Sequence, residues 1–470
     1  MSTTRESKIA RSFAALASGD ALARAVAFVA GVFVARRLGA EMFGVMAFGQ
    51  AVVLYFTHLA ACGVDLTGIR DIAQAPERAR THAPSILTFR TLVSAGLIAL
   101  LIGGALLVLP LLDAAVLALY ALTLFGHGPN PKFVLMGLSR PAPVAWARTA
   151  GEVLYVALVL AFVERRHDIV YVPWAQALGD ILAVLLMTLA LRRAGFRLDL
   201  ELDWPAVRPL FARSFPLVLN ILLGLLIFNS DLIVLRFFRD TETVGWYSAS
   251  YQLISFLINM AWAYSYSLLP SLAQARADTG ERQALYQTSL AQSFAVGLPI
   301  AVGGGVLSSA LIALVFGRDY AQSGPPLAIL IASIPWMLHK DVAMVAMIVA
   351  GRERAVAAMT AIAVVFNLLA NVLVIPRYGM IGAASTTLAT EVLRCVLAAW
   401  FVRRDGFAWI DPRRLWKSAV AAAAMAAVLV PLLDHPVWLA IPSGAAVYAL
   451  TLLAMRAVEW RRGAWPVLRV

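Results

Sequence analysis

Residues 33–73 read FVARRLGAEMFGVMAFGQAVVLYFTHLAACGVDLTGIRDIA, and this stretch decides the fold class. An apolar run ends at the charged corner Arg36-Arg37, and a second one runs from Phe43 to Gly63 before polar residues return at Asp65. The second run has the roughly 20 residues that a helix needs to cross a bilayer. Two such runs around a short charged corner are typical of a polytopic membrane protein.

The composition of the whole chain agrees with this interpretation. Hydrophobic residues make up 61% and charged residues 14% of 470 positions, and the mean hydropathy is +0.80. A soluble domain would carry roughly a quarter charged residues. The net charge of +12 lies in short clusters between apolar runs, which is a membrane-topology pattern rather than a nucleic-acid-binding face.

Apolar runs between Pro, Gly and charge breaks predict about fourteen transmembrane helices in an all-α fold. The expected spans are 13–35, 43–63, 85–109, 114–136, 144–163, 169–191, 213–237, 244–269, 288–316, 325–350, 354–375, 379–402, 416–433 and 437–458. We expect an N-terminal lobe over 1–192, a cytoplasmic linker over 193–212, a C-terminal lobe over 213–403, and a helix pair with a basic tail over 404–470. Two six-helix lobes would then enclose a central cavity.

A weak internal repeat supports the two lobes. Val34-Ala35-Arg36 leads to Phe43-Gly44, and Val234-Leu235-Arg236 leads to Val244-Gly245 six spans later. Because six helices separate the copies, both have the same orientation in the membrane, as in parallel transporter repeats. Most Lys and Arg residues between spans fall on the side of the N-terminus, so we expect both termini in the cytoplasm.

Several motifs resemble the Wzx-type polysaccharide and O-antigen flippases of the multidrug/oligosaccharidyl-lipid/polysaccharide superfamily. In the first half they are Ala35-Arg36-Arg37-Leu38-Gly39, Phe43-Gly44, Gly63-Val64-Asp65 and Arg70-Asp71-Ile72-Ala73. In the second half they are Asp231, Val244-Gly245-Trp246-Tyr247, Phe316-Gly317-Arg318-Asp319-Tyr320, Ile375-Pro376-Arg377-Tyr378-Gly379 and Gly382-Ala383-Ala384. They follow the family's order over nearly the whole chain.

The resemblance implies a non-enzymatic flippase of a bacterial inner membrane. Its substrate would be a polyprenyl-diphosphate-linked oligosaccharide, moved to the outer leaflet for O-antigen, capsule or exopolysaccharide synthesis. The lipid bilayer and, as a candidate, the polysaccharide polymerase machinery would be its partners. It needs no cofactor, and Na⁺ or H⁺ is the expected coupling ion.

Charged side chains inside spans are expensive and normally face a partner or water, at about 2.5–3.5 kcal/mol each. Three pairs have the three- or four-residue spacing of ion pairs on one helix face, so each either pairs structurally or lines the cavity. They are Asp20 with Arg24, Arg148 with Glu152, and Glu391 with Arg394. Lys340 and Asp341 are adjacent, and we expect them to point in different directions.

A diphosphate needs cationic donors, for which Arg supplies bidentate contacts and Lys a point charge. Our hypothesis is that Arg24, Arg90, Lys132 and Lys340 contact the diphosphate. Arg90 and Lys132 have no acidic residue nearby on their own helix, although Arg90 could instead extend to the cytoplasmic mouth.

A second group of residues offers oxygen donors suited to a small hard cation. Asp231 lies on the seventh span, Asn367 and Asn371 share a face of the eleventh, and Thr387 lies on the twelfth. The group resembles the sodium site of lipid II flippases, which implies a further contact from the Ala383 carbonyl. Asn371 replaces an aspartate of that family. Hydrogen bonding between helices is the alternative role for the two asparagines.

Three rival functions remain open at this point. A lipid II flippase would share the fold and the basic cavity. A multidrug cation antiporter of the same superfamily should prefer acidic or aromatic cavity groups, which Arg90 and Lys132 disfavour. A membrane glycosyltransferase would need larger external loops with catalytic acids. Glycine clusters at Gly103-Gly104 and Gly303-Gly304-Gly305 predict close helix approach or a bend.

Overall fold

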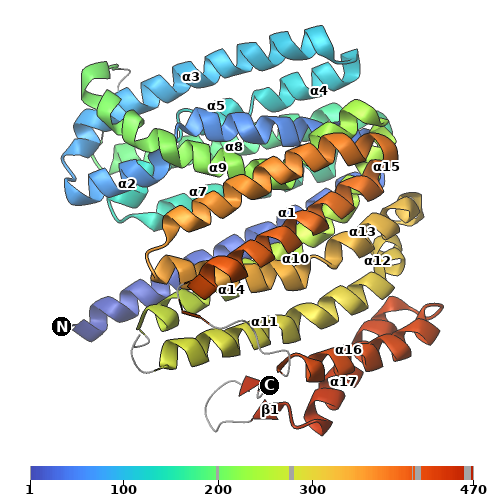
Figure 1. Cartoon of the computed structure of the whole chain (residues 1–470). Helices are drawn as coiled ribbons and strands as arrows, with labels where there is room; N and C mark the ends of the chain where they lie inside the picture. The colour runs from blue at the N-terminus through green and yellow to red at the C-terminus, as the bar shows by residue number, and fades with distance from the viewer. Residues whose placement is uncertain are drawn as a thin grey trace. The chain divides into compact units, whose positions relative to one another are not determined.

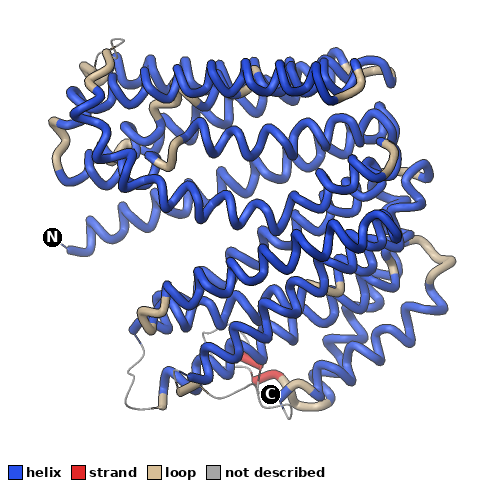
Figure 2. The backbone as a smooth tube through the Cα atoms, turned by 45° about the horizontal axis from the view of Figure 1, so that its top comes forward, coloured by secondary structure: helices blue, strands red, loops and turns tan. Residues whose placement is uncertain are grey.

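The computed structural model describes residues 2–196, 201–274, 280–404, 406–407, 414–459 and 467–468. Helices make up nearly all of these residues, and the strands β1 (Val458–Glu459) and β2 (Val467–Leu468) form one short antiparallel pair (Figures 1 and 2). The all-α fold class is therefore confirmed.

The chain divides into two compact units, Met1–Leu225 and Leu226–Val470. The first holds α1 (Ser2–Ala61), α2 (Val64–Gln74), α3 (Arg78–Val108), α4 (Leu111–Ala121), α5 (Leu124–His127), α6 (Lys132–Gly137), α7 (Pro141–Phe162), η1 (Arg166–Val170) and α8 (Tyr171–Arg193). The second holds α10 (Thr241–Gln274), α11 (Glu281–Val306), α12 (Ser308–Val315), η3 (Arg318–Ser323), α13 (Gly324–Ile331), α14 (Ile334–Val349), α15 (Glu353–Arg404), α16 (Trp416–Leu429), η5 (Val430–Leu432) and α17 (Val437–Ala454). The boundary falls within α9 (Trp204–Phe238), so a lobe boundary at 193–212 and a central cavity stay predictions.

Ten segments of the described chain are long and apolar enough to cross a membrane. Two of them, Val26–Gln74 and Glu353–Arg404, contain kinks at Gly39 and Gly379, so each accounts for two predicted spans. The eighth predicted span falls on α10, and the thirteenth on the shorter Trp416–Leu432 segment. All fourteen predicted spans thus coincide with helical segments, and the protein is a multi-pass membrane protein.

Both kinks are glycines with left-handed backbone angles, at φ +75° for Gly39 and φ +54° for Gly379. Other residues rarely adopt these angles. At the second kink, Arg239 donates hydrogen bonds to the carbonyls of Pro376 (3.0 Å) and Arg377 (3.3 Å), which the interrupted helix leaves free. A guanidinium therefore satisfies the carbonyls that the kink exposes.

Two other predicted spans, 114–136 and 325–350, are each divided into shorter helices. After α4, the Thr123 hydroxyl donates to the Tyr120 carbonyl at 2.7 Å, and after α13 the Ser333 hydroxyl donates to the Leu330 carbonyl at 2.5 Å. The backbone N–H groups of Thr123 and Ser333 donate to the same carbonyls at 3.0 Å, so each hydroxyl adds a second donor where the helix ends. Matching interruptions in helices six spans apart are in keeping with the predicted repeat.

Several small apolar cores stabilise each unit. In the first, α2, α3, α6, α7 and α8 bury side chains such as Ile72, Phe133 and Met187 together. In the second, α11, α14 and α15 share one core, while α16 and α17 pack on α11 through another (Figure 1). Large apolar side chains such as Leu107 (87% exposed) remain outside these cores, as expected where lipid is the solvent.

A close helix approach in the first unit joins α7 and α8 at two glycines. A Cβ atom at Gly151 would lie 2.5 Å from the Gly179 carbonyl oxygen, and one at Gly179 would lie 2.6 Å from that of Gly151. Gly304 likewise fits against Ile331. At Gly103 and Gly104, however, an added Cβ would meet nothing within 4 Å, so the predicted close approach there is wrong. Packing partners, which the sequence does not show, decide which glycines are needed.

We predict that Gly151→Ala destabilises the protein, because the new methyl group would overlap a backbone atom that cannot rotate away. Overpacking of this kind costs about 1–3 kcal/mol, and thermal unfolding in detergent measures it. Gly103→Ala is the matched control and should not lower the melting temperature, since its methyl group enters open space. Equal stability of the two variants would contradict the close contact of α7 and α8.

Candidate functional site

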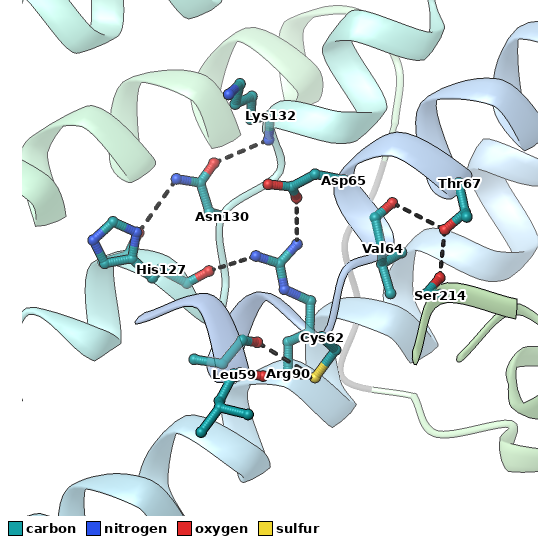
Figure 3. Close-up of polar contacts among 12 residues, drawn as sticks. Leu59, Cys62, Val64, Asp65, Thr67, Arg90, His127, Asn130, Lys132 and Ser214 are labelled. Atoms are coloured by element: carbon teal, nitrogen blue, oxygen red, sulfur yellow. Dashed lines mark hydrogen bonds and ion pairs between the residues drawn. The ribbon is translucent and has the colours of Figure 1, made fainter. Parts of the chain in front are cut away.

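A buried guanidinium is the centre of the polar site in the first unit. Arg90 lies on α3 with 2% of its surface exposed and donates to Asp65 Oδ1 (3.2 Å) and to the His127 carbonyl (2.8 Å) (Figure 3). The ring of Phe133 lies 5.9 Å from the guanidinium carbon, and Nε has no hydrogen-bond partner among the described residues. Arg90 is therefore paired inside the protein. It does not extend unpaired to the membrane surface, as the alternative had it.

A sharp corner between α1 and α2 brings Asp65 to Arg90. Gly63 has φ +65°, and a Cβ atom there would lie 2.6 Å from Val218 Cγ2 on α9, so the corner fits closely against that helix. Asp65 follows in the first turn of α2, where the helix dipole favours a negative charge. The Thr67 hydroxyl, two residues later, is 2.5 Å from the Ser214 hydroxyl. The carboxylate is thus positioned by backbone geometry, yet its side chain is 42% exposed.

The third component of the site is a helix that breaks within the membrane-spanning segment 111–137. Between α5 and α6, Asn130 donates to the Gly126 carbonyl (3.3 Å) and accepts from the Lys132 backbone N–H (3.0 Å). Arg90 takes the carbonyl of His127, the last residue of α5. Backbone groups at a break in the membrane must find partners in the protein or in a cavity, and here two side chains supply them.

Lys132 begins α6 and adds a second cation to the site. Its side chain is half-buried and points away from the Arg90 guanidinium (Figure 3). No acidic side chain among the described residues forms an ion pair with its ammonium. We call Asp65, Arg90, His127, Asn130 and Lys132 the Arg90 centre. It holds two cations and one carboxylate, and a second carboxylate, that of Asp180, lies at its edge, 3.9 Å from His127 Nε2.

Lys340 has a different environment, in the second unit. Its ammonium lies 3.0 Å from Asp341 Oδ1 and 3.2 Å from Glu391 Oε2. The expectation that Lys340 and Asp341 point apart is wrong, because the flexible four-carbon side chain carries the ammonium back to its neighbour. Glu391 also accepts from Arg394 at 2.6 Å, so that predicted pair is confirmed. The cluster is neutral, and Lys340 is already compensated.

The remaining predicted diphosphate contact, Arg24, lies outside the residues whose side chains the structure describes, as does its predicted partner Asp20. The structure therefore brings Arg90 and Lys132 together and places Lys340 in another cluster. A role of any of them in binding substrate stays a prediction.

A second polar group, in the second unit, surrounds a fully buried carboxylate on α9. Asp231 accepts hydrogen bonds from the hydroxyls of Tyr247 and Thr387 (3.2 Å for the latter) and from the Leu232 backbone N–H (2.8 Å). Ala383, one turn before Thr387 on α15, is also fully buried. Three helices converge here, since Tyr247 comes from α10.

The two asparagines of α15 belong to a neighbouring hydrogen-bonded group. Asn367 Oδ1 accepts from Ser230 (3.1 Å) and from Asn371 Nδ2 (3.0 Å), while Asn367 Nδ2 donates to Thr390 (3.0 Å). The asparagines therefore do bond between helices, as the alternative role proposed. Asn371 Oδ1, however, is buried and has no hydrogen-bond partner in the described part of the chain, while Asn371 Nδ2 donates to Ser230, the residue before Asp231.

Sequence reasoning missed several members of both groups. Asp65 stood in a quoted motif but was not linked to Arg90, because the contact joins residues 25 positions apart. The break at Asn130 had a visible signal in the run Gly128-Pro129-Asn130-Pro131, since Gly/Pro interruptions in apolar segments mark transporter sites. Tyr247 and Ser230 had no signal that separated them from packing residues.

Comparison with known proteins gives the family. Residues 9–276 match the family model described as polysaccharide biosynthesis protein. The chain is 25% identical over 238 residues to the probable flippase AglR of Haloferax volcanii, which covers 48% of this chain and 50% of the relative. It is 22% identical over 202 residues to an uncharacterized membrane protein of Methanocaldococcus jannaschii, covering 42% and 40%. The chain spans about half the length of the curated relatives it matches or less.

Solved structures agree on the fold. The lipid II flippase MurJ in an inward closed conformation superposes with a TM-score of 0.75 at 13% identity, covering 94% of this chain and 98% of that one. An inward-facing multidrug resistance MATE transporter of the MOP superfamily gives 0.66 at 13% identity, covering 82% and 98%. The family match over more than half of the chain shows that this protein belongs to the polysaccharide biosynthesis protein family, with the transporter fold of the superfamily that its sequence motifs predicted.

Proposed function

We propose that this protein is a flippase that moves a polyprenyl-diphosphate-linked oligosaccharide from the cytoplasmic to the outer leaflet of a bacterial inner membrane. The observation that carries the proposal is the Arg90 centre, where a buried arginine and a half-buried lysine lie at a broken membrane helix. Discontinuous helices with polar groups at membrane depth are typical substrate sites of transporters. Family membership supports a cargo used in polysaccharide synthesis.

The chemistry of the cargo fits this centre. A lipid diphosphate loses hydration when its head enters the protein, and cationic donors replace the lost water. Arg90 offers a planar guanidinium already held in place by the His127 carbonyl, and Lys132 offers a mobile point charge. The prenyl chain stays in lipid, towards which the helices expose apolar side chains such as Leu107 and Leu111.

Transport by alternating access requires the head to leave on the other side. Net anionic cargo moving outward gains about 2.3 kcal/mol per charge for each 100 mV of membrane potential. With both termini in the cytoplasm, as the loop charges favour, α2 and the start of α3 lie at the cytoplasmic side. The Arg90 centre would then receive the head first, and the polysaccharide polymerase machinery would use the released repeat unit outside.

We propose in addition that Asp231, Asn367, Asn371, Ala383 and Thr387 hold the coupling ion, Na⁺ or H⁺. The support is the fully buried carboxylate of Asp231 together with the buried amide oxygen of Asn371, which has no hydrogen-bond partner among the described residues. Buried ionisable groups in membrane helices are functional by default because their burial is expensive. The hydroxyls of Tyr247 and Thr387 satisfy Asp231 without an ion.

Replacing the cations of the Arg90 centre should abolish export. We expect Arg90→Gln to lower surface polysaccharide at least tenfold and Lys132→Gln to lower it by a smaller factor. Arg90→Lys should keep partial activity, because the ammonium retains the positive charge but lacks the paired donors of the guanidinium. Surface polysaccharide in a deletion strain, normalised to membrane protein level, measures this.

Arg403→Gln is the control, since this exposed arginine lies in the last turn of α15 and belongs to the other unit. Wild-type export by both Arg90→Gln and Lys132→Gln would overturn the proposal. Mass spectrometry of the glycolipid that accumulates in the deletion strain identifies the cargo. Rescue of cells depleted of lipid II transport would identify a peptidoglycan precursor instead.

Asp231→Asn should remove the ion dependence of transport. In proteoliposomes we expect the wild-type rate to respond to a Na⁺ or pH gradient, and the response to disappear in the variant because the only carboxylate of the proposed site is gone. Asp240→Asn, at the exposed corner between α9 and α10, should retain the response. A full response in Asp231→Asn would exclude this ion site.

A further inference from the structure

We propose that Asp65 is an internal substitute for the diphosphate: it occupies the Arg90 guanidinium until the substrate displaces it, and thereby sets the affinity and selectivity of the site. This inference rests on the proposed function of the Arg90 centre. It assigns a role to a carboxylate that no part of the transport scheme above uses.

The two partners of the pair differ greatly in exposure. The side chain of Arg90 is 2% exposed, whereas that of Asp65 is 42% exposed, although their atoms lie 3.2 Å apart (Figure 3). A pair that served only to hold α2 against α3 would be most effective with both partners enclosed. Here the carboxylate is the accessible partner, so a ligand can reach the guanidinium at the position of the carboxylate.

The energetics favour an exchange of anions over the exposure of a bare cation. A buried Arg without an anion is strongly destabilising, because nothing then compensates its desolvated charge. Asp65 prevents this in the empty protein, and a phosphate oxygen would prevent it in the loaded one. Because Asp65 is already partly hydrated, its release into water carries only a small desolvation difference.

The guanidinium is held in position during the exchange. Its bond to the His127 carbonyl is 2.8 Å long and independent of Asp65, and Asn130 supports the same broken helix on the other side. Arg90 therefore keeps its place while the anion at Nη1 changes. A diphosphate that replaces Asp65 there carries more negative charge than a single carboxylate, which gives it an advantage at the guanidinium.

The consequence is a threshold for binding. Any anion that reaches Arg90 must compete with a carboxylate tethered in the first turn of α2, and a weak or singly charged anion competes poorly. Removing the competitor should tighten binding of every anion at this site. Loss of a merely structural ion pair would loosen the site and weaken binding, so the two roles predict opposite signs.

The experiment measures binding of farnesyl diphosphate, as a short polyprenyl diphosphate probe, to the full-length protein in lipid nanodiscs. We expect Asp65→Asn to lower the dissociation constant about fivefold or more, the upper range for a partly exposed ion pair. Asp65→Glu, which keeps the charge, should stay near the wild-type affinity. In the Arg90→Gln background, Asp65→Asn should have no effect, because the competition needs the guanidinium.

Asp71→Asn is the matched control on the same helix. Its carboxylate pairs with Arg78 and His82 rather than with Arg90, so its loss should leave probe affinity unchanged. Should Asp65→Asn be recovered at low level, Asp65→Ser in the same assay decides the question. Unchanged or weaker binding by both Asp65 variants, with binding still lost in Arg90→Gln, overturns the substitute role alone. Normal binding by Arg90→Gln overturns the proposed site itself.

Discussion

Backbone groups inside a bilayer find no water, so every place where a membrane helix stops must be satisfied by the protein itself. This constraint organises the described structure. At the break between α5 and α6, Asn130 and Arg90 take up carbonyls and an amide. At the Gly379 kink Arg239 takes up two carbonyls. Polar and charged side chains lie at these interruptions because a regular helix pairs its own backbone groups, whereas an interrupted one needs side chains as partners.

The same constraint explains why the buried charges come in compensated groups of different character. Lys340, Glu391 and Arg394 form a cluster with Asp341 in which cations and anions balance, so its net charge is zero. The Arg90 centre instead pairs its buried guanidinium with a carboxylate that remains accessible. An enclosed network suits a structural role, whereas a partly open one suits an anionic ligand. The exposure of the carboxylate in each cluster thus separates cations that look alike in the sequence.

Pairing of helices depends on contacts of another kind. Where hydrophobic burial does not favour one partner over lipid, close backbone approach between small residues supplies the packing energy. The Gly151 and Gly179 contact is such an approach, and Gly103 and Gly104 face open space despite their similar sequence context. Glycine content alone therefore does not locate an interface.

The sequence by itself determined the membrane class, the helical fold, the positions of the spans and the family. Each depends on local composition or on ordered motifs, such as the apolar runs around Arg36-Arg37, which are written in consecutive residues. It also identified Arg90, Asp231 and the asparagine pair as candidates, since a polar residue in an apolar run stands out. Tertiary structure alone decided the partners: Asp65 for Arg90, Tyr247 for Asp231, Ser230 for Asn367, and Asp341 with Glu391 for Lys340. These contacts join different helices or depend on side-chain rotamers, and neither helix periodicity nor hydropathy specifies which helical faces meet.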